Sequence, residues 1–138
     1  MKSDPEKMKS LIVVIILTGL IVSVLVLNGC SSNNTDTLIL KDKMIIPQDK
    51  CKFLDKYIFI HETGCPHCAN VIPRIRQVEH EFNITFKEYN LAVKEDLDAI
   101  NRLKILPQGV PCVIIDCKVY LGDRYSVDDF KQAILKNN

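Results

Sequence analysis

Hydrophobic and polar positions divide the chain into an apolar N-terminal segment and a longer part with a mixed pattern. Residues 11–27 are 17 mostly apolar positions without a charge, which is long for the core of a signal peptide and near the lower limit for a membrane span. Residues 31–37 are small and polar, which is typical of a flexible tether. We therefore expect the folded domain to begin between Leu38 and Phe53.

Four strands are predicted beyond the tether. Residues 57–60 are apolar, with β-branched and aromatic side chains, which is typical of a central strand buried on both faces. Residues 83–91 alternate enough to form a second strand. Residues 110–115 and 119–122 form two more, and the tight turn between them indicates a hairpin.

Three helices are predicted from the spacing of apolar residues. The first begins near Cys68, and Pro73 inside it should bend it. Its buried stripe consists of Val71, Ile72, Ile75, Val78 and Phe82. A short second helix covers residues 97–103. A third runs to about residue 136, and at its start Ser126 and Asp129 resemble a capping box.

The order of these elements, β-α-β-α-β-β-α, predicts an α/β domain. The first two strands are joined through a helix and should be parallel, whereas the last two should be antiparallel. The result is a mixed four-stranded sheet with helices on both faces. We divide the chain into a signal or anchor segment at residues 1–30, a tether and lead-in at 31–50, and the domain at 51–138.

Charge places the domain relative to the membrane. Lys2, Lys7 and Lys9 precede the apolar segment and the next charge is Asp36, so the positive end should stay in the cytoplasm and the rest should lie outside. The sequence has 18 Lys and Arg and 17 Asp and Glu. Three of the basic and two of the acidic residues lie before residue 30, so residues 31–138 carry 15 of each and are close to neutral. No basic surface suited to nucleic acid is indicated.

The apolar segment ends in Leu-Asn-Gly-Cys, and Cys30 is its last residue. A small residue before a cysteine at this place resembles a lipoprotein processing site, at which Cys30 would become the lipidated N-terminus. The alternative is an uncleaved anchor helix with an incidental cysteine. Both interpretations predict a domain tethered to the outer face of the membrane.

Two cysteines, Cys65 and Cys68, lie where the first strand passes into the first helix. A thiolate at Cys65 would meet the free N–H groups and the positive dipole end of that helix. Cys68 is one turn further on and points the same way. Pro66 suits the first turn of a helix, and Gly64 gives the chain room to turn. The pair could also be half of a zinc site, with Cys112 and Cys117 as the second ligand pair. The predicted strand and turn place those two cysteines differently, which favours redox chemistry.

Residues 57–136 resemble the thioredoxin fold. Three features carry the resemblance: Cys-Pro-His-Cys after a strand, Pro73 five residues after the second cysteine, and Val110-Pro111 at the start of the third strand. The resemblance implies that Pro111 is cis and lies against the active-site disulfide. The Pro-His dipeptide is the one found in Dsb-family oxidants.

The sequence departs from thioredoxin at two positions. Gly64 stands where thioredoxin has a Trp, and Phe59 stands where it buries an Asp that accepts the proton of the second cysteine. Glu62 is the nearest acid, and it lies off the strand. The resemblance therefore does not imply how Cys68 loses its proton.

The site residues are assigned roles on this basis. Cys65 is the nucleophile and Cys68 the resolving thiol. Pro66, His67 and Pro111 shape or tune the site. As a cation beside Cys65, His67 would stabilise the thiolate and make the disulfide a stronger oxidant.

The other cysteines of the domain are assigned separately. The third strand should run antiparallel to the first, with Pro111 near Cys65. Cys117 then falls near the far end of the first strand, where Cys51 also lies, and we predict a Cys51–Cys117 disulfide. Cys112 then stays free, either as a buried core thiol or as a partner of the active-site pair in holding a soft metal such as Cu(I).

The sequence thus predicts a membrane-anchored, extracytoplasmic thiol–disulfide oxidoreductase that exchanges disulfides with protein cysteines, in the oxidising direction. It should need no cofactor and no metal, act as a monomer, and be reset by a membrane redox partner. The alternatives are a Cu(I) or soft-metal carrier of the same fold and a glutaredoxin-like reductase.

Overall fold

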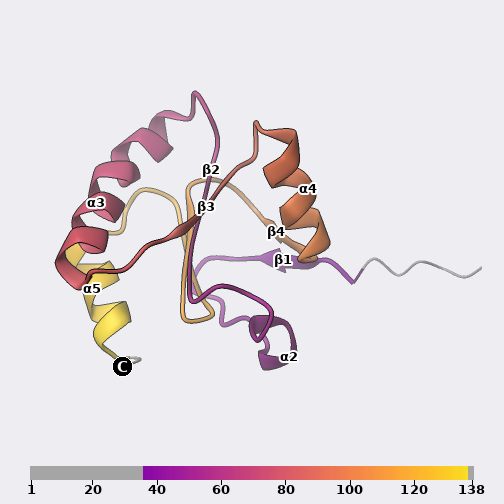
Figure 1. Cartoon of the computed structure of the whole chain (residues 1–138), viewed down its shortest axis with the longest axis horizontal. Coiled ribbons are helices and arrows are strands. Elements are labelled where there is room, and N and C mark those ends of the chain that lie inside the picture. The colour runs from indigo at the N-terminus through magenta and orange to yellow at the C-terminus, as the bar shows by residue number, and fades with distance from the viewer. Residues whose placement is uncertain (1–35, 137–138) are drawn as a thin grey trace, which may run out of the picture. The chain divides into compact units, whose positions relative to one another are not determined.

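The computed structural model describes residues 36–136, whose elements are arranged around a four-stranded mixed sheet (Figure 1). The strand order is β3-β2-β5-β6. β2 (Tyr57–His61) pairs in parallel with β3 (Lys87–Asn90) and antiparallel with β5 (Cys112–Ile115). β5 pairs antiparallel with β6 (Lys118–Leu121). The predicted α/β class and mixed sheet are confirmed.

Helices cover both faces of this sheet. α3 (Pro66–Phe82) and α5 (Val127–Leu135) pack on one face, where their apolar side chains meet Phe59. α4 (Lys94–Arg102) packs on the other face with Ile58 and Ile60. The side chains of β2 therefore alternate between two cores, and all three of these residues are fully buried, as a central strand requires.

The ends of the helices follow from local sequence. α3 begins two residues earlier than the apolar spacing predicts, because Cys65 caps it and Pro66 occupies its first position. Pro73 lies inside the helix, as expected. α5 begins with the predicted capping box, in which Ser126 accepts from the Asp129 N–H and the Asp129 carboxylate accepts from the Ser126 N–H.

The segment expected as a lead-in carries regular structure of its own. β1 (Leu38–Leu40) pairs in parallel with β4 (Ile105–Pro107), and neither strand was expected. Leu40 is fully buried beside the α4 face of the sheet. A short helix, α2 (Gln48–Cys51), follows. The packed structure therefore starts before residue 51, because Leu40 and Ile46 complete the second core.

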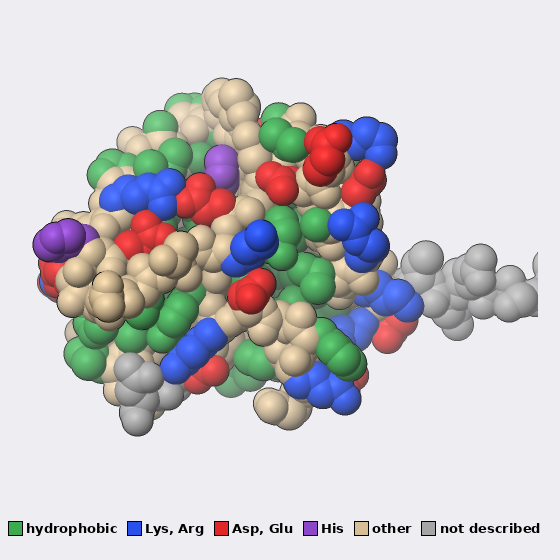
Figure 2. All heavy atoms as spheres, viewed as in Figure 1, with side chains coloured by type: hydrophobic (Ala, Val, Ile, Leu, Met, Phe, Trp, Pro, Cys, Tyr) green, Lys and Arg blue, Asp and Glu red, His purple; other side chains and the backbone are tan. Residues whose placement is uncertain are grey.

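Residues 1–35 and 137–138 lie outside the described residues, and so do the apolar segment at 11–27 and Cys30. In the described part of the chain, no helix is long and apolar enough to cross a membrane. The face of the domain seen in Figure 2 carries Lys and Arg side chains interspersed with Asp and Glu.

Candidate redox site

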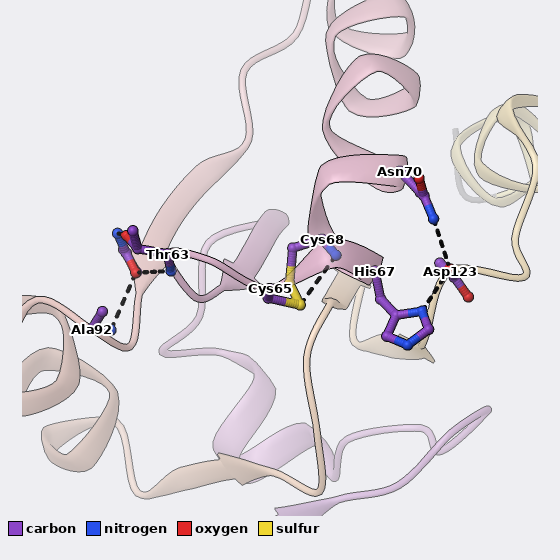
Figure 3. Close-up of a disulfide and its surroundings, with 8 residues drawn as sticks. Thr63, Cys65, His67, Cys68, Asn70, Ala92 and Asp123 are labelled. Carbon is purple, nitrogen blue, oxygen red and sulfur yellow. Dashed lines mark hydrogen bonds and ion pairs between the residues drawn. A yellow bond between two sulfur atoms is a disulfide. The ribbon is translucent and has the colours of Figure 1, made fainter.

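The pair Cys65 and Cys68 forms a disulfide at the junction between β2 and α3, with Cα atoms 5.3 Å apart (Figure 3). The chain leaves β2 and turns at Gly64, whose φ of +82° is a left-handed conformation that glycine adopts without cost. Cys65 follows in an extended conformation as the N-cap of α3. Its Sγ atom accepts a hydrogen bond from the Cys68 N–H at 3.2 Å.

The two sulfur positions differ in access. Cys65 is half-buried, whereas Cys68 is only 1 % exposed. Cys65 also has the position of a capping group, so a thiolate there would accept a charge-assisted hydrogen bond at the positive end of the helix dipole. The geometry thus gives one sulfur that a partner can reach and one that is shielded.

Two prolines lie in the segments that lead into α3 and β5. Pro66 occupies the first turn of α3. The Val110–Pro111 peptide bond is cis. Pro111 directly precedes Cys112, which pairs with Ile60 in β2, so it lies at the end of β2 from which the chain leads to Cys65. The Pro111 carbonyl accepts a hydrogen bond from the Gly122 N–H at 2.9 Å.

His67 is bound to an acid that the sequence analysis did not assign. Its Nδ1 atom lies 2.8 Å from Oδ2 of Asp123, in the loop between β6 and α5. In Figure 3 the His67 ring extends toward Asp123 and not over the sulfur atoms. The hydrogen bond with His67, together with one from the Asn70 amide at 3.1 Å, lowers the pKa of the Asp123 carboxyl. The expected role of His67 as a cation beside Cys65 must therefore take this carboxylate into account.

Asp123, Asn70 and Arg74 are the residues that the sequence analysis missed. Asn70 and Arg74 follow His67 by three and seven positions, so the three side chains lie along one stripe of α3. The Arg74 guanidinium donates to the carbonyl oxygens of Asp123 and Tyr125 at 2.5 and 2.7 Å. The helical spacing was a usable signal, but nothing in the sequence indicates which loop this stripe would meet.

A hollow of about 380 Å³ opens beside the disulfide. Its lining includes His61, Glu62, Thr63, Gly64, Cys65, Pro66, Cys68, Ala69 and Ile72.

Phe59, at the position where thioredoxin has an Asp, is fully buried under α3, and no polar or charged side chain is buried within residues 36–136. His61 stacks on Phe59, and its Nε2 atom lies 3.7 Å from Glu88.

The remaining cysteines of the domain do not belong to the Cys65–Cys68 disulfide. Cys51 and Cys117 form a disulfide between α2 and the β5–β6 turn, with Cα atoms 5.7 Å apart. Cys112 is a free thiol buried in the core on the α4 face. Among residues 36–136, no three His, Cys, Asp or Glu side chains form a group that could hold a metal ion.

Burial raises the pKa of the Cys112 thiol to about 12. We expect this thiol to resist alkylation by iodoacetamide at pH 8 in the folded protein, because the reactive form is the thiolate. It should become labelled after unfolding in guanidinium chloride. Peptide mass spectrometry of the two samples measures both states, and rapid labelling of folded protein at Cys112 would contradict the burial described above.

A scan against models of protein families found no match for the chain, and a search of curated proteins found none either.

Proposed function

We propose that this protein is a membrane-tethered thiol–disulfide oxidoreductase of thioredoxin-like fold that acts outside the cytoplasm on cysteines of other proteins. The observation that carries the proposal is the unequal access of two bonded sulfur atoms at a helix N-terminus. Cys65 is partly exposed and its Sγ atom accepts the Cys68 N–H, while Cys68 is only 1 % exposed. Such a pair can form a mixed disulfide at one sulfur and resolve it with the other.

In the oxidising direction, a substrate thiolate attacks Sγ of Cys65. The substrate–Cys65 bond forms, the Cys65–Cys68 bond breaks, and Cys68 leaves as a thiolate that takes up a proton. A second substrate thiolate then attacks the substrate sulfur of this mixed disulfide, and Cys65 leaves as a thiolate. Two electrons pass from the substrate to the pair, so no cofactor is required, and a membrane redox partner must take these electrons to reset the disulfide.

The thioredoxin-like assignment is supported by topology together with motif. A strand, a helix and a parallel strand are followed by an antiparallel hairpin, with the cysteine pair after β2 and a cis proline before β5. The oxidising direction is supported by the placement of Cys65 at the N-terminus of α3, which favours its thiolate and hence the reduced form of the pair. The extracytoplasmic placement rests on the charge pattern around residues 11–27.

The test is the reduction potential of the Cys65–Cys68 pair in the full-length chain, held in a mild detergent and equilibrated with glutathione buffers. A value near the oxidising extreme, about −120 mV, supports a protein that introduces disulfides. A value near that of thioredoxin, about −270 mV, supports thiol–disulfide exchange but reverses the direction. If Cys65 and Cys68 show no redox equilibrium with glutathione at all, the proposed function is wrong.

A further inference from the structure

The loop between β6 and α5 is fixed against the redox site from two sides. At its start, the Gly122 N–H donates to the carbonyl oxygen of Pro111 at 2.9 Å. On its outer side, Arg74 of α3 donates to the carbonyl oxygens of Asp123 and Tyr125. The position of the Asp123 carboxylate is therefore set by α3, which carries Cys68, and by the cis-proline segment that leads into β5.

This fixed carboxylate contacts the one titratable side chain between the two cysteines. His67 is 68 % exposed at its side chain, so little else holds the ring in place. Asp123 Oδ2 is hydrogen-bonded both to the His67 ring nitrogen and to the Asn70 amide (Figure 3). Without Asp123, an exposed ring on the first turn of a helix would sample several rotamers, including those nearer to Sγ of Cys65.

We propose that Asp123 is a positioning residue that holds the His67 ring away from the disulfide, offsets its charge, and thereby limits how oxidising the Cys65–Cys68 pair is. This inference rests on the proposed function. It concerns how strongly the pair draws electrons from a substrate, which the Cys-Pro-His-Cys motif alone does not determine.

The charged groups around His67 support this role. An imidazolium near Cys65 stabilises its thiolate, and a carboxylate on the same ring cancels much of that effect. The two arginines nearest in the network are engaged elsewhere: Arg74 binds main-chain oxygens, and Arg124 pairs with Asp42. Asp42 is in turn held by the Tyr125 hydroxyl at 2.6 Å. Asp123 is thus the group that the described structure places on the His67 ring.

The experiment replaces Asp123 by asparagine in the full-length chain in detergent and measures the potential of the pair against glutathione at pH 7. Asp123→Asn keeps a hydrogen-bond acceptor for the ring but removes the negative charge. We expect the equilibrium constant for oxidation of glutathione to rise about threefold to tenfold, where tenfold corresponds to about 30 mV. The matched control is Asp49→Asn, which removes the same charge from α2 and should leave the potential unchanged.

A double-mutant cycle distinguishes positioning from a direct charge effect. In the His67→Gln background, Asp123→Asn should shift the equilibrium constant by less than half of the factor seen with His67 present, because no imidazole remains whose charge the carboxylate could offset. An equal shift in both backgrounds would show that Asp123 acts on the Cys65 thiolate directly, and would overturn the positioning role.

The remaining outcomes separate this inference from the proposed function. If the wild-type pair equilibrates with glutathione and Asp123→Asn leaves its potential unchanged, the inference is wrong and the proposed function stands. If the wild-type pair does not equilibrate, both fail. A melting temperature measured for each variant checks that the fold is retained.

Discussion

Under the proposed function, replacing Cys68 by serine should turn the protein into a trap for mixed disulfides. In this variant Cys65 keeps its place at the N-terminus of α3, and its thiolate can still attack a disulfide of the resetting partner or of another protein. The Cys68 sulfur that would then attack the mixed disulfide and release that protein is gone. A serine hydroxyl cannot take its place, because it is neither acidic nor nucleophilic enough at neutral pH. Covalent adducts should therefore accumulate on Cys65 and disappear on reduction.

The adducts are measured by non-reducing electrophoresis after membranes carrying the full-length chain are quenched with acid and alkylated. Peptide mass spectrometry then identifies Cys65 and the partner cysteines. Cys65→Ser should instead give no adducts and reduce insulin-disulfide exchange to the rate without protein, since Cys68 is shielded from any partner. Cys112→Ala, which removes a thiol outside the site, should retain exchange.

Adducts that form on Cys68 rather than Cys65 would reverse the assigned roles. Normal turnover by Cys65→Ser would show that exchange does not pass through this pair. Proteins trapped by Cys68→Ser but not by the Cys65→Ser/Cys68→Ser double variant would be the substrates and the resetting partner.

The central part of the fold could be predicted because its signals are local. Residues 57–60 are uniformly apolar, and the structure buries Ile58, Phe59 and Ile60 completely in β2. The capping box of α5 and the apolar stripe of α3 are likewise patterns within one element, although the prediction that Ile72 is buried in that stripe was wrong, since its residue is 36 % exposed. β1 and β4 could not be predicted in this way, because each has three residues and their pairing joins positions about 67 apart in sequence.

The same distinction holds at the site. Cys65, Pro66 and Cys68 are contiguous, so their arrangement follows from a strand that passes into a helix. Asp123 lies 56 residues from His67 and reaches it only through the loop that Arg74 and Pro111 fix in place. An exposed acid in a loop has no distinguishing pattern in a single sequence, so the contact that bears most on the charge of His67 needed the structure.

Removing the Cys51–Cys117 disulfide should have the largest effect on stability. It links residues 66 positions apart, and a loop of that length corresponds to about 4 kcal/mol in the chain-entropy account, with about 2–4 kcal/mol typical of measured cases. The double variant Cys51→Ala/Cys117→Ala avoids a stray thiol. We expect it to lose about 2–4 kcal/mol in guanidinium unfolding of the full-length chain in detergent.

The backbone at residue 117 provides a sharper version of this prediction. Asp116 and Cys117 form the two-residue turn between β5 and β6, with φ of +46° and +67°, and such turns favour glycine at the second position. Cys51→Ala/Cys117→Gly should therefore be more stable than the double alanine variant, by up to about 1 kcal/mol, because glycine tolerates the left-handed conformation. Both variants lack the cross-link and differ only at residue 117. The difference between their free energies of unfolding measures the turn, and the loss that they share relative to wild type measures the disulfide. When the wild type is reduced before unfolding, it should lose most of the same free energy of unfolding. The difference between the reduced wild type and the two variants should therefore be small. A common loss below about 1 kcal/mol would show that the cross-link does not carry the stability expected of a loop this long.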